Sequence, residues 1–525
     1  MNQTELKRIL DAHPELRQKL YARGFLLSDD QIEADKYPFY GLWKETLFGR
    51  YHLLTSEGTN CFVFSTEITS MALVGHAYDP FTMVFQETEI LCDLTKALST
   101  GEDCFWDQLN NLTGVFTLLV LKDGELRVIG DAAGLQSTFY CVKNGRVYIA
   151  SHTNIFSDLL SLCRDPYIER LAHYRFFKLL GNSLPGDLTP FSEVKRLVPN
   201  HYVLIDKKKE IAVKRFYWPH LLKMSRSEIV EEVSQIMHAN MFLISQKWDR
   251  PAISMTGGCD SKTTLACTNG LYEKFSYFSY ISSESEEVDA YAAKSICEAL
   301  GLKHTIYQIP DDDNALPDVA CVREIINWNT GDIRYSNPND VRKRICFSEV
   351  DDFDVEVKSW ASEIGRAYYS KRFNGRKDFG EHPTPRKCTS LYKFFLFDRK
   401  LVKDTDRVFA EYLNHYFEQS DDSPIEWQEQ FFWEFRVPSW NGIVITGEHR
   451  YSFDITIPYN NRRILQLLLS APIEDRINDR VYFEIREKQN PSIDKTGISV
   501  TNIKHTKNRE KMENIYFSLH SSLPF

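Results

Sequence analysis

A short apolar run, two glycines and a helix form the stretch that most constrains the fold of this chain. Pro251 to Met255 is apolar and predicts a buried strand, and a helical pattern begins at Ser261. Between them, Gly257 and Gly258 allow backbone N–H groups to face an anion beside the positive end of the helix dipole. Asp260 also lies in this turn, and its charge tolerates a phosphate only if a cation such as Mg²⁺ bridges the two. The stretch therefore predicts a phosphate site.

The segments around this turn predict a parallel α/β unit. Ser225–Lys247 has helical periodicity, Phe275–Ile281 and His304–Gln308 have the composition of strands, and Val288–Leu300 is a helix that ends at Gly301. This β-α-β-α-β order implies parallel strands with right-handed crossovers. Ligands then bind beyond the carboxyl ends of the strands, where the glycine turn already lies.

The first part of the chain, about residues 1–220, has a different pattern. A helical segment over residues 4–22 is expected to be divided by Pro14, and Glu87–Leu98 is expected to be a second helix. Asp123-Gly124 and Asn144-Gly145 each predict a hairpin turn. The expected strands are Tyr51–Thr55, Cys61–Ser65, Met71–Gly75, Thr113–Leu121, Glu125–Ile129, Ser137–Val142 and Val147–Ser151. Strands interleaved with a few helices indicate packed layers.

Length and composition narrow the class of protein. The 525 residues suggest two or three domains, and the net charge of −10 counts against a general nucleic-acid surface. The 11 cysteines contain no C-x-x-C pair, which favours neither a disulfide framework nor a zinc site and fits a reducing cytoplasm. No apolar run approaches the roughly 18 residues of a membrane span. A cytoplasmic protein with no membrane partner is expected.

The glycine turn resembles the pyrophosphate loop, S-G-G-x-D-S, of the ATP pyrophosphatases (PP-loop enzymes). These enzymes split ATP into AMP and pyrophosphate in order to adenylate a substrate. The resemblance implies ATP and Mg²⁺ as cofactors. The residues that it assigns to the nucleotide are Ser254, Thr256, Gly257, Gly258, Asp260 and Ser261, with Lys262 as a catalytic candidate. The alternative is a glycine-rich turn that binds nothing.

A series of short pieces in the first part resembles the glutaminase domain of class B asparagine synthetases. The pieces are Leu112 to Phe116, Gly130 to Gly134, Phe139-Tyr140, Ala150 to His152, Pro185 to Phe191, Leu197 to Asn200 and Arg215 to Trp218. They occur in the order that the family has. The resemblance implies an N-terminal Ntn-hydrolase-like αββα sandwich over residues 1–220. A parallel-sheet synthetase domain of the adenine-nucleotide α-hydrolase type would follow over residues 221–525, so that the class is α/β plus α+β.

A second motif, Ser359 to Tyr369, aligns without gaps on G-E-G-A-D-E-L-F-G-G-Y of the same family. Glu363 stands where the family has the aspartate that supplies a second carboxylate to Mg²⁺, with Asp260 supplying the first. An exposed residue at the start of a helix is the alternative for Glu363. Trp360 stands where relatives have an acid or a tyrosine, and an indole cannot act as a base.

Cationic candidates are expected farther along the chain. The family's catalytic lysine aligns with Tyr482, and the nearest cations are Arg480 and Arg476, of which Arg480 is the chosen candidate. Arg334 follows Ile333, as in an Ile-Arg pair of the family, and could meet a phosphate or a carboxylate. A surface position is the alternative for each arginine. Residues 370–440 match the family poorly and are expected to cap the site and to set substrate choice.

The first domain departs from the family at its nucleophile. Relatives use a cysteine at position 2 to hydrolyse glutamine, and this chain has Asn2. No glutamine hydrolysis is expected, as in the related β-lactam synthetases and lasso-peptide cyclases. The chain thus resembles a ligase that adenylates a carboxylate and joins it to an amine. A catalytically decayed nucleotide-binding or regulatory protein and a nucleobase-modifying enzyme are the alternatives. The expected partner is a small molecule or peptide with a carboxylate and an amine, and a homodimer is a candidate assembly.

Overall fold

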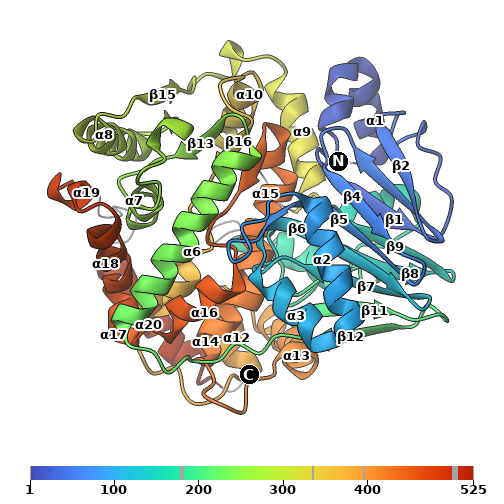
Figure 1. Cartoon of the computed structure of the whole chain (residues 1–525). Helices are drawn as coiled ribbons and strands as arrows, with labels where there is room; N and C mark the ends of the chain where they lie inside the picture. Colours follow the sequence, from blue (N-terminus) through green and yellow to red (C-terminus); the bar gives the residue numbers. More distant parts are fainter. Residues whose placement is uncertain (1, 178–182, 334–335, 394–395, 499–506, 524–525) are drawn as a thin grey trace.

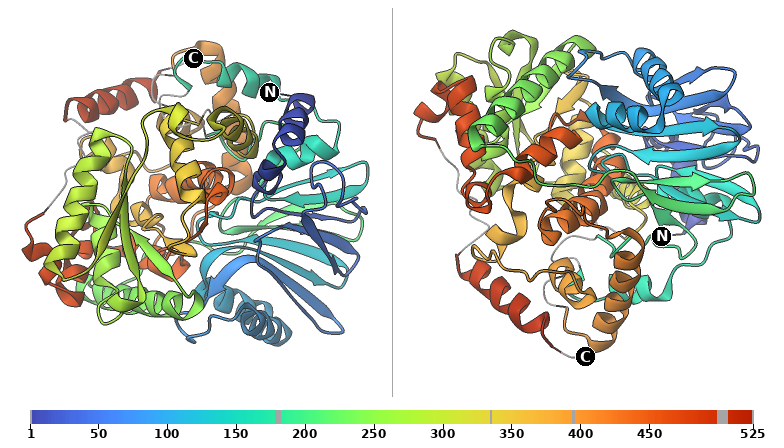
Figure 2. Two further views of the ribbon diagram at one scale, coloured as in Figure 1. Left: turned by 90° about the horizontal axis from the view of Figure 1, so that it is seen from above. Right: turned by 60° about the horizontal axis from the view of Figure 1, so that its bottom comes forward.

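Three sheets organise the computed structural model, which describes residues 2–177, 183–333, 336–393, 396–498 and 507–523. Two are antiparallel and six-stranded, and both lie within residues 25–215; the third is parallel and five-stranded, within residues 251–456 (Figure 1). Seen from above, the antiparallel sheets and the parallel sheet lie side by side (Figure 2). The fold class expected from the sequence is therefore confirmed, whereas the boundary at residue 220 stays a prediction.

The antiparallel sheets form a sandwich. The first has the order β10-β8-β9-β1-β3-β2 and the second the order β12-β11-β7-β6-β5-β4. The strands are β1 (Phe25–Ser28), β2 (Trp43–Phe48), β3 (Tyr51–Ser56), β4 (Cys61–Ser65), β5 (Thr69–Tyr78), β6 (Thr113–Lys122), β7 (Glu125–Gly130), β8 (Phe139–Lys143), β9 (Arg146–Ala150), β10 (Lys195–Arg196), β11 (His201–Ile205) and β12 (Ile211–Arg215). One apolar cluster joins their facing sides and includes Leu27, Leu53, Val74 and Leu119. Burial of that cluster holds the two sheets together.

Helices cover both outer faces of the sandwich. The second sheet packs against α2 (Glu87–Thr100) and α3 (Glu102–Asn111). The outer face of the first sheet packs against α1 (Gln3–Ala12), the 3-10 helix η1 (Pro14–Lys19) and α4 (Thr153–Leu159). The same cluster also contains apolar residues of α9 (Val319–Asn329) and α10 (Pro338–Ser348). The fourth layer of the αββα sandwich is therefore completed by helices from the second part of the chain.

The parallel sheet has the order β15-β14-β13-β16-β17. Its strands are β13 (Pro251–Ser254), β14 (Ser276–Ile281), β15 (His304–Gln308), β16 (Val355–Val357) and β17 (Asp454–Thr456). The chain proceeds outward from β13 to β15 on one side, and then returns to the other side of β13 as β16 and β17. This reversal makes the junction of β13 and β16 a topological switch point, the place where open α/β sheets bind ligands.

Helices connect and surround these strands. In the first part, α5 (Pro166–Ala172) follows α4; around the parallel sheet are α6 (Arg226–Lys247), α7 (Cys259–Ala266) and α8 (Glu284–Ala299). The later helices are α11 (Tyr368–Arg372), α12 (Pro385–Tyr392), α13 (Arg399–Tyr416), α14 (Trp427–Phe431), α15 (Ile443–Gly447), α16 (Arg462–Ser470), α17 (Ile473–Ile477), α18 (Arg480–Gln489), α19 (Ser492–Lys495) and α20 (Lys507–His520). Two π-helical segments, η6 (Phe432–Arg436) and η7 (Pro438–Gly442), lie between α14 and α15. No helix in the described part of the chain is long and apolar enough to cross a membrane.

Several local predictions agree with these elements. The segment 4–22 is divided at Pro14 into α1 and η1, and a Ser225–Glu228 capping box begins α6. Asp123 and Asn144 have φ values of 52°, followed by glycines with positive φ, so both hairpins turn as the sequence predicts. The sequence analysis did not predict strands β1, β2, β10, β11, β12, β16 and β17. All 11 cysteines are free thiols.

Buried polar contacts join the sandwich to the second part of the chain. The indole Nε1 of Trp433 donates to the carbonyl of Ala132 at 2.8 Å, and Asn460 Nδ2 donates to Asp131 at 2.9 Å. Arg215 of β12 forms a two-point ion pair with Glu434 of η6, at 2.7 and 2.8 Å, and both side chains are no more than 3% exposed. Residues in the stretches that resemble the glutaminase domain thus make buried contacts with the second part of the chain.

Breaking the Arg215–Glu434 pair should destabilise the protein. Arg215→Met leaves a buried carboxylate uncompensated, which costs about 3–5 kcal/mol. Adding Glu434→Gln should recover part of that loss, because the remaining group is neutral. Arg407→Met, at a 67% exposed side chain, is the control and should change stability by less than about 0.5 kcal/mol. Thermal unfolding measures all four proteins, and a double variant no more stable than Arg215→Met would contradict the expectation.

Candidate functional site

A cleft of about 480 Å³ lies at the switch point of the parallel sheet. The residues that line it come from β13 and the turn after it, from β14, and from the segment after β16. Helices α8 and α10 and residues 440–449 supply the others. They include Ser254, Thr256, Asp260 and Ser261 from the glycine turn, and Glu363 from the second motif. Two motifs separated by about 100 residues in the sequence therefore meet in one cavity.

Hydroxyl groups close the turn between β13 and α7. The hydroxyls of Thr256 and Ser261 are 2.9 Å apart, and Ser261 also donates to the carbonyl of Thr256 at 2.8 Å. The N–H of Gly258 donates to Thr256 Oγ1 at 3.1 Å. Gly258 has an extended conformation (φ −74°), so its function is to leave space: a Cβ there would lie 3.1 Å from Thr256 Oγ1. The N-terminal end of α7 begins at the next residue, as an anion site requires.

Asp260 is held by two groups from the second motif. One carboxylate oxygen accepts from Ser362 Oγ at 2.7 Å, and the other forms an ion pair with Arg366. Arg366 also contacts both oxygens of Asp479, at 2.8 and 2.9 Å, and Lys371 pairs with Asp479 at 2.5 Å. Two carboxylates and two cations therefore form one continuous network beside the turn.

Glu363 is half-buried in the 3-10 helix η5 (Ser362–Arg366). Burial, and then the charge of Asp260, raise its pKa to about 7. Tyr482 fixes this helix, because its buried hydroxyl donates to the carbonyl of Ser362 at 2.7 Å. Two carboxylates that repel each other in one cleft are a suitable oxygen donor set for Mg²⁺, which would relieve the repulsion. The residues present thus fit the metal that the resemblance implies.

The arginines that the sequence offers in place of the family's lysine lie outside the cleft. Arg480, on the first turn of α18, is 55% exposed, pairs with Asp475 at 3.5 Å and does not line the cleft. Arg476 is buried against Glu426 and Glu429. Neither arginine lines the cleft, so a catalytic function for Arg480 stays a prediction that its position does not favour.

Lys262 also does not line the cleft. It is on α7, but it is buried on another side of the helix, where Nζ donates to the carbonyl of Ile498 at 3.1 Å. Burial, and then the charge of Arg486, lower its pKa. Arg334 lies outside the described residues.

Aromatic residues form part of the cleft wall. Trp360 packs edge-on against His449, with ring centroids 5.1 Å apart, and Lys358 Nζ lies 5.1 Å from the centre of the Trp360 ring. Trp440, on η7, is 41% exposed and lines the same cavity. Of residues 370–440, Trp440 on η7 thus reaches the site, whereas Trp433 is completely buried.

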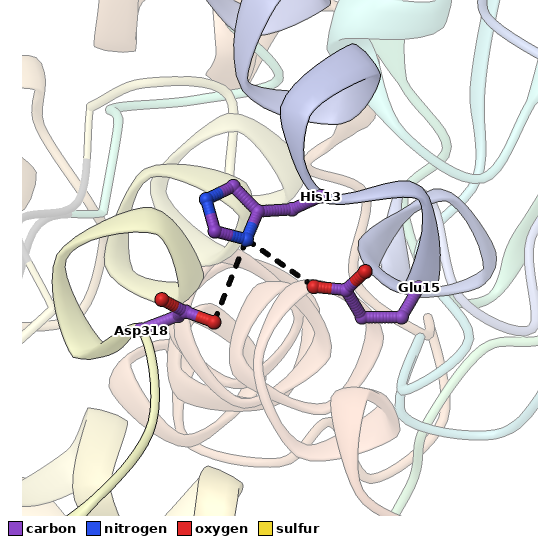
Figure 3. A group of neighbouring side chains, drawn as sticks. All are labelled: His13, Glu15 and Asp318. Carbon is purple, nitrogen blue, oxygen red and sulfur yellow. Dashed lines mark hydrogen bonds and ion pairs between the residues drawn. The ribbon is translucent and has the colours of Figure 1, made fainter.

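The start of the chain has a structural function in this fold. Asn2 is the N-cap of α1, and its side-chain oxygen accepts from the N–H of Glu5 at 2.9 Å. Nearby, His13 Nδ1 lies 3.2 Å from Glu15 and 3.5 Å from Asp318, the N-cap of α9 (Figure 3). This exposed group connects the N-terminal segment to the second part of the chain, and no further feature there indicates a bound metal.

Comparisons with known proteins leave the family open. No protein-family model and no curated protein matches the chain. Among solved structures, it is similar to the allosteric regulatory enzyme of purine biosynthesis (12% identity, TM-score 0.23, 56% of this chain and 63% of that chain). It is also similar to glutamine phosphoribosylpyrophosphate amidotransferase from B. subtilis complexed with ADP and GMP (10% identity, TM-score 0.23, 70% of this chain and 74% of that chain). A third similar structure is glutamine-dependent NAD⁺ synthetase from Acinetobacter baumannii in complex with ADP (12% identity, TM-score 0.21, 46% of this chain and 54% of that chain).

The chain thus spans less than two thirds of the length of the first and third of these structures. At such TM-scores the similarity supports no inference about activity, so function has to be inferred from the cleft.

Sequence reasoning missed two cations: Arg344, which lines the cleft, and Arg366, which pairs with Asp260 beside it. Arg366 stands where the aligned motif has phenylalanine, and this exchange of an apolar for a charged residue was a usable signal. Arg344 lines the cleft from α10, which the sequence reasoning did not predict as an element. Nothing in the local pattern distinguishes it from neighbouring surface arginines.

The raised pKa of Glu363 should make Mg²⁺ binding depend on pH. The metal needs the ionised carboxylate, so affinity should rise by up to about tenfold between pH 6 and pH 8, across a pKa of about 7. Without Mg²⁺, the raised pKa means that the folded protein holds the Glu363 proton more tightly than the unfolded chain does. The free energy of unfolding should therefore fall as pH rises from about 4, the pKa in the unfolded chain, to about 7. Calorimetry with Mg²⁺ at both pH values checks the first effect. Glu363→Gln should remove both, and an unchanged profile in that variant would contradict the assignment.

Proposed function

We propose that the protein is an ATP-dependent, AMP-forming carbon–nitrogen ligase that adenylates a carboxylate and joins it to an amine. One observation carries the proposal: Thr256, Asp260 and Ser261, at the glycine turn before α7, line the same switch-point cleft as Glu363. An anion site beside two metal-suited carboxylates is the arrangement that cleavage of ATP to pyrophosphate requires.

The residues have separate functions in this reaction. The loop N–H groups and the N-terminus of α7 bind the pyrophosphate, while the substrate carboxylate oxygen attacks the α-phosphorus and pyrophosphate leaves. Asp260 and Glu363 would hold Mg²⁺, which supplies positive charge to the leaving group. The amine nitrogen then attacks the acyl carbon, its proton is lost and AMP departs. Adenylation helps because AMP is a much better leaving group than hydroxide.

Arg366 supplies the cation that position 482 lacks. Its guanidinium lies 5.7 Å from the centre of the Tyr482 ring and pairs with Asp260 at the turn. An arginine stabilises developing negative charge but does not lose a proton. We therefore assign Arg366 to electrostatic stabilisation of the leaving pyrophosphate, in place of Arg480.

A second candidate function is nucleotide binding without catalysis. The observation in its favour is that both oxygens of Asp260 are already engaged, one by Ser362 and one by Arg366. Mg²⁺ has to replace part of these contacts. Binding of Mg²⁺-ATP with no pyrophosphate release, across carboxylate–amine substrates, would favour this function over the ligase.

Removal of the Asp260 carboxylate tests the site. Wild-type protein should bind Mg²⁺-ATP in calorimetry and lose that binding when Mg²⁺ is chelated. Asp260→Ala should bind at least tenfold more weakly, because one of the two carboxylates is gone. Asp475→Ala is the matched control, since Asp475 pairs with Arg226 and Arg480 outside the cleft. Equal binding by Asp260→Ala and wild type would refute the nucleotide site.

Arg366 should matter more for the reaction than for binding. Arg366→Leu restores an apolar residue and should reduce the rate of pyrophosphate release by about 10²–10³, the usual effect of losing one stabilising charge. Arg366→Lys should retain part of the rate. Mg²⁺-ATP affinity should not fall, because Asp260 is released for the metal. Pyrophosphate release at the wild-type rate in Arg366→Leu would rule out this assignment.

A further inference from the structure

The cleft contains one buried cation for which the described residues provide no partner. Arg344, on α10, is 3% exposed and lines the cavity, yet neither Nε nor Nη1 has a hydrogen-bond partner among the described residues. Its recorded side-chain contact there is with the ring of Phe347, whose centre lies 5.8 Å from the guanidinium carbon. A guanidinium remains charged at any physiological pH, so its N–H groups require an acceptor.

Two lysines that line the cleft in the described part of the chain differ from Arg344. Lys343 pairs with Glu286 at 2.6 Å and with Asp340 at 3.4 Å, and Lys358 pairs with the buried Glu356 at 2.8 Å. Each of these lysines is neutralised by protein. An unpaired buried charge is costly, and a protein retains one where a ligand supplies the counter-charge.

The surroundings of Arg344 favour a compact anion. Three carboxylates (Glu286, Asp289 and Asp340) line this side of the cleft, against the cations Lys343 and Arg344. A triphosphate, with about four negative charges, would be repelled by this wall, whereas one carboxylate can pair with the planar fork of the guanidinium. The residues of the glycine turn and Glu363 belong to a different wall, the one after β13 and β16.

We propose that Arg344 binds an anionic group of the acyl substrate other than the carboxylate that is adenylated. This inference rests on the proposed function, and it narrows the substrate to molecules with at least two negative groups, of which we commit to a second carboxylate. Binding by Arg344 would fix the far end of the substrate on α10 and leave the near carboxylate free to approach the nucleotide. Arg344 is therefore a specificity-determining residue.

The test compares diacids with their own half-esters. Succinate, glutarate and adipate, each beside its monomethyl ester, are titrated into the full chain by calorimetry, with and without Mg²⁺ and α,β-methylene-ATP. At least one diacid should bind wild type tenfold to a hundredfold more tightly than its ester, the range for a hydrogen-bonded charge. Arg344→Met should abolish that preference, and Arg344→Lys should retain part of it.

The matched control is Arg342→Met, on the same helix, because Arg342 pairs with Asp313 at 2.6 Å outside the cleft. It should keep the diacid preference, and thermal melting of each variant verifies the fold. Diacids that bind wild type no more tightly than their esters would overturn the proposal, as would a preference that survives in Arg344→Met. Loss of nucleotide affinity in Arg344→Met, with the preference intact, would assign the anion to the nucleotide phosphates instead.

Failure of the proposed function has a separate signature. It would appear as absent Mg²⁺-ATP binding in the wild type, whereas the nucleotide-free titrations still test Arg344.

Discussion

The reversal of strand order between β13 and β16 is the constraint on which the site depends. The two strands pair in parallel, with Ala252 opposite Glu356, so the loops that follow them leave the sheet at the same edge. One loop carries the glycine turn and Asp260, and the other carries Glu363 and Arg366. Because both loops start from buried, hydrogen-bonded strands, the charged groups are placed by rigid elements. Such placement is what electrostatic stabilisation of a leaving group requires.

Charge in and around the cleft is balanced pair by pair. Asp260, Arg366, Asp479 and Lys371 form one network, and the lysines of the cleft wall each have a carboxylate. Among the described residues, Glu363 and Arg344 depart from this balance: burial and the charge of Asp260 raise the pKa of Glu363 to about 7, and Nε and Nη1 of Arg344 have no acceptor there. These departures are of opposite sign and match opposite ligands, a metal cation and a substrate anion. Glu363 and Arg344 thus indicate the chemistry of the ligands better than the ion-paired residues do.

The sandwich has a structural connection to this site. Stretches that resemble a glutaminase domain supply the acceptors for Trp433 and Asn460, and Arg215 forms its ion pair with Glu434. The nucleophile position of that family is occupied by Asn2, whose side chain caps α1. The absence of glutamine hydrolysis stays a prediction. The contacts nevertheless explain why the sandwich is retained. Helices α9 and α10 pack on the outer face of its first sheet, and η6 pairs with β12 at the edge of its second sheet.

Local patterns were sufficient for the elements with strong periodicity or turn chemistry. The strand, turn and helix at residues 251–266, the split at Pro14 and both hairpins follow from side-chain spacing and from residues that tolerate positive φ. Short strands such as β16 and β17, of three residues each, carry too little pattern to be predicted. Arg480 was expected near the nucleotide from its spacing, but the direction in which a helix faces depends on packing, and α18 turns it to solvent.

The sequence alone determined the fold class, the glycine turn and the likeness of Glu363 to a metal-binding aspartate, because these depend on neighbours along the chain. Only the tertiary structure decided that Arg366 pairs with Asp260, and that Arg344 lines the cleft with no partner among the residues that the structure describes. Both facts depend on which distant segments a buried sheet brings together.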